Sequence, residues 1–182
     1  MKQLSLRPGD VVVALQLALL PVSRLEDISS ATLRSLGEVH NAVVRLRSAR
    51  LLKPEAREVV REPLLNFIRW GVPFAFPAVV GGMALGVTTG VVPSSGLGAN
   101  QSANSAEVAS SEFVWPSSTG TTRGQALVPL YARAPELVAI NPALRTLLSL
   151  VDLIRIGGAR EGSNAIAAIA HELTRIDTKD GV

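Results

Sequence analysis

The segment 35–50 constrains the fold most, because it carries both a helix start signal and the periodicity of an amphipathic helix. Ser35 followed by Glu38 forms a capping box, in which the hydroxyl and the carboxylate each satisfy an amide group at the helix start. Apolar residues recur at helical spacing along one face. They are Val39, Ala42, Val43 and Leu46. The sequence therefore predicts a surface helix over 36–50 that buries this face.

The opposite face of this helix carries side chains that can read DNA bases. It consists of Gly37, Asn41, Val44, Arg45 and Ser48. In the major groove, asparagine can pair with adenine and arginine with guanine. The face therefore predicts a DNA recognition helix. The alternative is an ordinary amphipathic helix with a solvated basic side.

Two shorter helices are predicted upstream. Asp10 is expected to cap a helix over 11–20, which Pro21 ends because the residue before a proline avoids the helical region. Ser23 is expected to cap a second short helix, and residues 31–34 form the turn into Ser35. Only Gln16 interrupts the apolar first helix, which therefore needs cover on every side. We expect that cover from the second half of the chain or from a partner subunit.

Downstream, residues 51–53 and 58–60 are predicted as short strands joined by a turn, which together make a small wing. Short helix, tight turn, capped helix is the helix-turn-helix order. Residues 5–62 resemble the winged helix-turn-helix domains of bacterial transcription regulators, broadly the MarR-like kind. The whole chain, including the segments 74–77 and 81–82, is similar to a group of bacterial MarR-like proteins. The turn departs from this pattern by lacking a glycine, and Gly37 departs from it by lying in the first turn of the recognition helix.

Charge is concentrated in the same region. Residues 1–69 hold eleven basic and seven acidic residues (11 − 7 = +4), whereas residues 70–182 hold seven and eight (7 − 8 = −1). Basic side chains near a recognition helix can neutralise phosphates and release counterions. The candidate DNA-binding residues are Arg34, Ser35, Gly37, His40, Asn41, Val44, Arg45, Arg47, Ser48, Lys53 and Arg57.

The second half, 63–182, is predicted as an α+β domain for dimerisation or partner binding. A helix from 62 to 70 is expected to end at Gly71, and strands at 74–76 and 83–85 to form a hairpin. The loop 93–112 is poor in bulky apolar residues and is expected to be disordered or to order on a partner. Further along, the sequence predicts a strand at 113–115, an Asn141-capped helix that ends at 157–158, and a Ser163-capped helix.

Several function classes are not supported by the composition. Cysteine is absent, which excludes disulfides and thiolate metal sites. His40 and His171 lie in no nucleophile, phosphate-binding or metal-ligand motif, so we expect no enzyme activity, no metal and no cofactor. The apolar stretch 72–92 is broken by proline and glycine, and no signal peptide is evident, so a cytoplasmic protein without a membrane span is expected.

The sequence thus predicts a mainly helical α+β fold, with a winged helix-turn-helix domain over 1–62 followed by a β-hairpin and C-terminal helices. The expected function is sequence-specific DNA binding by a bacterial transcription regulator, a repressor acting as a homodimer. The alternative is a protein-interaction module, such as an antitoxin-like partner, that binds through 93–112 or the C-terminal helices. A variant of the regulator would sense a small molecule in an aromatic pocket. That pocket would be lined by Trp70, Phe74, Phe76 and Trp115.

Overall fold

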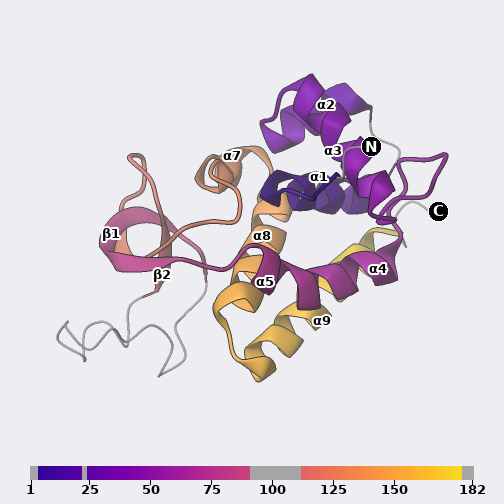
Figure 1. Ribbon diagram of the computed structural model, residues 1–182. Helices are drawn as coiled ribbons and strands as arrows, with labels where there is room; N and C mark the ends of the chain where they lie inside the picture. The colour runs from indigo at the N-terminus through magenta and orange to yellow at the C-terminus, as the bar shows by residue number, and fades with distance from the viewer. Residues whose placement is uncertain (1–3, 22–23, 91–111, 178–182) are drawn as a thin grey trace.

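Helix α1 (Pro8–Leu19) lies in the middle of the helical part of the molecule (Figure 1). In this computed structural model, which describes residues 4–21, 24–90 and 112–177, α1 packs against helices on opposite sides. These are α2 (Leu25–Thr32), α3 (Leu36–Ser48), α8 (Pro142–Ile156) and α9 (Ala159–Asp177). The expectation that the second half covers the apolar first helix is confirmed.

The predicted caps of the first three helices have different outcomes. Ser35 caps α3 as predicted: its Oγ accepts from the Glu38 amide at 3.3 Å, and the Ser35 amide donates to Glu38 Oε2 at 3.0 Å. Asp10 does not cap α1, because the helix already begins at Pro8, whose missing amide suits a first helical position. The Asp10 carboxylate instead accepts from the Arg7 amide at 2.8 Å. The predicted cap Ser23 lies outside the described residues.

The turn between α2 and α3 places Leu33 in the left-handed region, at φ 56°. This is the conformation that glycine adopts most easily at the end of a helix. The Arg34 amide donates to the Ser29 carbonyl at 3.1 Å, and Ser29 Oγ donates to the Arg34 carbonyl at 2.5 Å. The turn that lacks a glycine therefore keeps the glycine-type geometry with a leucine.

The segment after α3 forms a minimal hairpin, here called the 51–60 hairpin. A single antiparallel bridge joins Leu52 to Val59. The Lys53 amide donates to the Glu58 carbonyl and the Val60 amide to the Leu51 carbonyl, both at 2.9 Å. The two predicted strands thus pair, but over only a few residues. The hairpin extends as a loop beside α3 (Figure 1).

The helix after the hairpin is longer than predicted. It runs from α4 (Arg61–Asn66) through the π-helical turn η1 (Phe67–Gly71) into α5 (Val72–Ala75). Gly71 therefore does not end it, and the predicted strand at 74–76 is wrong. The other predicted strand, 83–85, lies inside the nine-residue strand β1 (Val80–Thr88). The expected hairpin between these two segments does not form.

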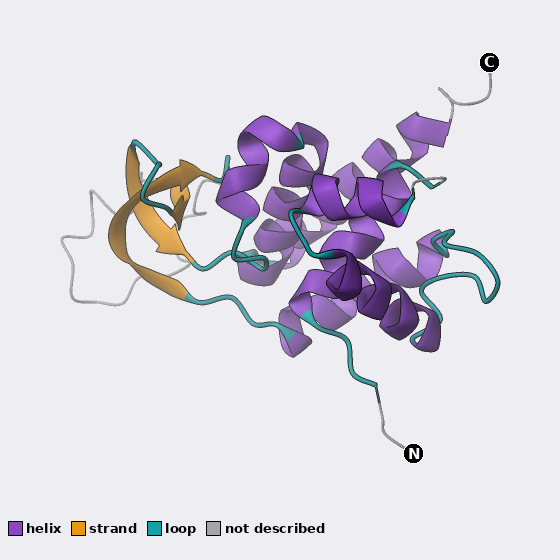
Figure 2. Ribbon diagram, turned by 90° about the horizontal axis from the view of Figure 1, so that it is seen from above, coloured by secondary structure: helices purple, strands orange, loops and turns teal. Residues whose placement is uncertain are grey.

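A small sheet lies at one end of the molecule, beyond the helices (Figure 2). Strand β1 pairs antiparallel with both β2 (Phe113–Pro116) and β3 (Thr122–Leu127). Strands β2 and β3 pair parallel, so the curled sheet closes on itself. The predicted strand at 113–115 is confirmed. The predicted loop 93–112 lies, apart from Glu112, outside the described residues.

The C-terminal part begins with η2 (Ala134–Glu136) and α7 (Leu137–Ile140) and continues into α8 and α9. Asn141 caps α8 as predicted, with its Oδ1 accepting from the Leu144 amide at 3.1 Å, and α8 ends at Gly157. Helix α9 begins at Ala159, four residues before the predicted cap. Ser163 is therefore inside the helix, where its Oγ donates to the Ala159 carbonyl at 2.8 Å.

One hydrophobic core includes residues from both halves of the chain. It joins α1 and α3 to α8 and α9 through side chains such as Leu15, Leu46, Leu147 and Ile169. A boundary at residue 62 therefore does not separate two cores. The mixed, mainly helical α+β class is confirmed. Within the described part of the chain, no helix combines the length and the apolar character needed to cross a membrane.

Candidate nucleic-acid interface

The exposed face of α3 is the candidate site, and four residues form its central row. Gly37, Asn41, Val44 and Ser48 are all exposed. At 3.6 residues per turn they lie within about 60° of one another around the helix axis. A side chain added at Gly37 would meet no atom within 4 Å, so the backbone there is open to a ligand. The row presents a bare backbone, a carboxamide, an isopropyl group and a hydroxyl.

Arg45, predicted on this face, is not part of the exposed surface. Its Nε donates to Asp10 Oδ2 at 2.7 Å and its Nη2 to Asp10 Oδ1 at 2.6 Å. The Arg45 side chain is 11% exposed and the Asp10 side chain 0%. The two side chains form a salt bridge, and the hydrogen bonds to Asp10 raise the pKa of Arg45. The prediction that Arg45 lies on the exposed face of α3 is therefore wrong.

Arg34 is also engaged within the protein. Its Nη2 donates to Glu38 Oε1 at 3.0 Å, and its guanidinium lies over the Tyr131 ring, 5.7 Å from the centroid. It also lies against Gly9 of α1 so closely that a Cβ at that position would clash with it. Only 13% of the Arg34 side chain is exposed. Arg34 thus contacts α1, α3 and Tyr131, and it is not available to a phosphate.

Glu38 is the one carboxylate in the first turn of α3. It accepts from the Ser35 amide and hydroxyl at 3.0 and 2.8 Å, in addition to Arg34. The hydrogen bonds from Ser35 lower the pKa of Glu38, so it is anionic. The charges of Arg34 and Glu38 offset one another at the helix start, where Ser35 has a structural role as the cap.

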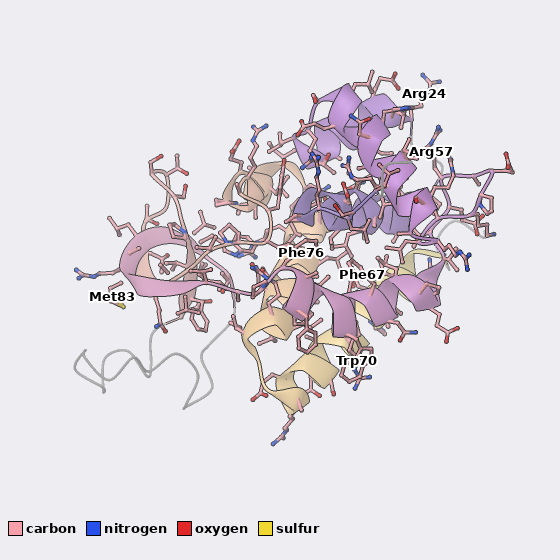
Figure 3. The ribbon with its side chains drawn as sticks, viewed as in Figure 1. Arg24, Arg57, Phe67, Trp70, Phe76 and Met83 are labelled. Atoms are coloured by element: carbon pink, nitrogen blue, oxygen red, sulfur yellow. The ribbon has the colours of Figure 1, made fainter. Side chains whose placement is uncertain are left out.

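The accessible positive charge lies at the C-terminal end of α3 and on the 51–60 hairpin. Arg47, Arg50 and Arg57 are exposed and form no ion pair with any residue that the structure describes. Arg47 Nη2 points toward the hairpin, 3.5 Å from the Ala56 carbonyl. Lys53 pairs with Glu58 at 2.5 Å, but both side chains are about half exposed, so the pair is weak. Figure 3 shows Arg57 at the edge of the molecule beside α3.

The remaining predicted residue, His40, is exposed on the side of α3 next to the central row. The structure therefore leaves eight of the eleven predicted residues exposed on α3 and the 51–60 hairpin. It withdraws Arg34 and Arg45 from this surface, and it uses Ser35 as the helix cap. Those that share the surface are Gly37, His40, Asn41, Val44, Arg47, Ser48, Lys53 and Arg57. Arg50, which the sequence analysis left out of the candidate site, belongs with them.

Three residues of the second half hold the turn that precedes α3, and sequence reasoning missed all three. The Tyr131 hydroxyl donates to the Thr32 carbonyl at 2.7 Å, and Arg133 Nη1 donates to the Leu33 carbonyl at 2.6 Å. Asn141 Nδ2 donates to Gln16 Oε1 at 2.7 Å and to the Ala31 carbonyl at 3.2 Å. These contacts satisfy carbonyls at the end of α2 that the helix itself leaves free. No local sequence signal indicates such long-range partners.

The four aromatic residues predicted to line a pocket do not share one. Trp70 is 61% exposed and Phe74 83% exposed, whereas Trp115 is fully buried and donates through Nε1 to Asp152 at 2.7 Å. Figure 3 shows Trp70 on the side of η1 turned away from α3, with Phe76 labelled between α5 and α8. The small-molecule pocket is therefore not present as predicted.

Comparisons with known proteins add no relative. No protein-family model matches the chain. No curated protein matches it, and no solved structure matches it. The surface of α3 and the 51–60 hairpin is therefore what bears on function.

Proposed function

We propose that the protein is a sequence-specific DNA-binding transcription regulator that places α3 in the major groove of double-stranded DNA. The observation that carries this proposal is the exposed row of α3, which offers hydrogen-bonding and apolar groups and ends beside unpaired arginines. Base contacts from such a row would specify the sequence, while the arginines contact phosphates. The size of α3 suits this use, because the major groove is wide enough to admit an α-helix.

The arrangement of elements supports a winged helix-turn-helix interpretation. Helices α2 and α3 are joined by a tight turn at Leu33, and the 51–60 hairpin follows α3 in the position of a wing. In this arrangement α3 reads bases and the wing contacts the backbone of the duplex. Lys53 and Arg57 of the hairpin would then bind phosphates, for which the exposed Glu58 carboxylate is a weak competitor.

Regulators of this kind act as dimers on paired half-sites, and we propose a homodimeric repressor. Trp70 and Phe74, four residues apart along η1 and α5, both expose their side chains, and exposed large apolar groups favour association. The same observation favours the second candidate function, a protein-interaction module that binds an unlike partner. Sedimentation of the purified protein, alone and with DNA, separates a homodimer from a monomer that needs another protein.

The direct test is binding of fluorescent duplexes, one from the DNA upstream of the protein's own gene and one of random sequence, over a range of salt concentrations. We expect tighter binding to the upstream duplex. Affinity should fall steeply with salt, because phosphate contacts release counterions. Arg57→Ala should weaken binding to both duplexes and reduce the salt slope by about one. Arg123→Ala is the matched control, because Arg123 is exposed on β3 at the other end of the molecule (Figure 2). Equal loss in both variants, or no binding to any duplex, contradicts the proposal.

A further inference from the structure

We propose that the exposed row of α3 selects A·T base pairs, with Asn41 pairing to adenine and Val44 contacting the methyl group of a thymine. This inference rests on the proposed DNA-binding function and names the sequence class that the reading face accepts. It follows from which side chains the fold leaves free on α3 and which it engages elsewhere.

The exposed row of α3 contains no side chain that reads guanine. The commonest contact to guanine is a bidentate one from arginine or lysine to its O6 and N7 atoms. Arg45, the one arginine close to the row in the middle of α3, is held by two hydrogen bonds to the buried Asp10 carboxylate. Moving it to a base would leave Asp10 as an unpaired charge with no exposed surface, which is strongly unfavourable.

The other arginines near α3 do not replace it. Arg34 is held by Glu38 and Tyr131 at the start of the helix. Arg47 projects about 90° around the helix from the centre of the row, toward the Ala56 carbonyl of the 51–60 hairpin. Arg50 lies beyond the last turn of α3, where the duplex backbone would pass. Arg47 and Arg50 are thus placed to contact phosphates, and the row itself has no cation.

The two side chains at the centre of the row, Asn41 and Val44, match the groups of an A·T pair. The Asn41 carboxamide has a donor and an acceptor side by side, which matches the N7 acceptor and the N6 donor of adenine. Val44 is 40% exposed and offers an isopropyl group, which matches the thymine methyl group. Asn41 and Val44 are three residues apart and thus neighbours on the helix surface. Together they fit adjacent A·T pairs.

Gly37 and Ser48, at the two ends of the row, do not alter this preference. Gly37 has no side chain and open space around it, which permits close approach of the helix to the duplex. Serine contacts different bases without discrimination. Glu38, which could otherwise accept from cytosine, is already engaged by Ser35 and Arg34. The preference is therefore set by Asn41 and Val44.

The experiment is selection from a random duplex library by the full chain, followed by affinity measurements on the selected duplex with single-atom changes. Replacing thymine by uracil removes only the methyl group, and replacing adenine by 7-deazaadenine removes only the N7 acceptor. We expect A·T pairs at adjacent central positions. We expect about a four-fold loss for the critical uracil, from the contact of about one buried methyl group. We expect a loss of at least about five-fold for the critical 7-deazaadenine.

The protein variants assign each effect to a residue. Val44→Ala should lose the sensitivity to uracil and keep the sensitivity to 7-deazaadenine, and Asn41→Ala should show the reverse. Arg123→Ala, on β3 and away from α3, is the control and should keep both sensitivities. Selection of G·C pairs at these positions, or sensitivities that the variants leave unchanged, would overturn this inference while DNA binding stands. Failure to enrich any duplex would instead overturn the proposed function.

Discussion

The guanidinium of Arg45 in α3 makes two hydrogen bonds, at 2.7 and 2.6 Å, to the carboxylate of Asp10 in α1. Because Asp10 also accepts from the Arg7 amide at 2.8 Å, its carboxylate joins the start of α1 to the middle of α3. This pair fixes how α3 lies on the central helix. It also removes from the exposed face of α3 the cation that the sequence predicted there.

Arg45→Ala should therefore lower the free energy of unfolding by about 3 kcal/mol, because it leaves the buried Asp10 charge without its partner. Urea denaturation followed by circular dichroism measures this change. Arg47→Ala is the control, because Arg47 lies two residues further along α3 and is exposed. It should change the free energy of unfolding by less than about 0.5 kcal/mol. A loss of DNA specificity in Arg45→Ala with unchanged stability would return Arg45 to the reading face.

Ser35→Ala should lower stability by about 1 kcal/mol through loss of the α3 cap. The effect should depend on pH, because the Ser35 amide and hydroxyl both lower the pKa of Glu38 below its usual 4.5, and the variant removes the hydroxyl. A lowered pKa stabilises the fold above about pH 4.5, and this contribution is lost as the pH falls through the folded pKa. The difference between wild type and Ser35→Ala should thus be larger at pH 7 than at pH 3. Ser48→Ala, near the other end of the helix, should show no such pH dependence.

Features set by local chemistry could be predicted from the sequence. The Ser35–Glu38 box and the Asn141 cap depend on residues three apart, and both form as predicted. Arg45 was misplaced because its partner is 35 residues away along the chain. Asp10 was predicted as a local helix cap, so its salt bridge with Arg45 was not expected. Helical periodicity alone placed Arg45 at the edge of the solvent-exposed face of α3. It could not show that the Arg45 side chain reaches toward α1.

The prediction of a helix end and a hairpin in the region 71–88 was wrong for a different reason. Glycine at 71 and proline at 73 normally end a helix, which predicted a break and a strand at 74–76. The π-helical turn of η1 carries the chain past Gly71, and Pro73 lies in the first turn of α5, where its missing amide is tolerated. Phe74 therefore lies on a helix with its side chain exposed. Whether a helix continues through such a break depends on packing, in this case of α5 on α8.

Tyr131→Phe should destabilise the turn before α3 by about 1 to 2 kcal/mol, because it leaves the buried Thr32 carbonyl without its hydroxyl donor at 2.7 Å. The ring would still pack, so the fold should persist. Hydrogen exchange is the suitable measurement, and amides of residues 32–35 should exchange faster while those of α9 are unchanged. Uniform acceleration through the molecule would mean that Tyr131 acts on global stability and not on this turn.

Arg50→Gly should raise the free energy of unfolding by up to about 1 kcal/mol. Arg50 follows the C-cap of α3 and has φ 60°, a left-handed conformation that costs a non-glycine residue about 1 kcal/mol. Its side chain is exposed, so little packing is lost. Arg50→Ala is the matched control, because it removes the same charge but keeps a Cβ and should give no gain. Leu33, with a similar φ of 56°, should show no such gain on replacement by glycine, because its side chain packs against the core. Thermal unfolding of the three variants tests this, and a gain in Arg50→Ala equal to that in Arg50→Gly would show that charge, not backbone conformation, is responsible.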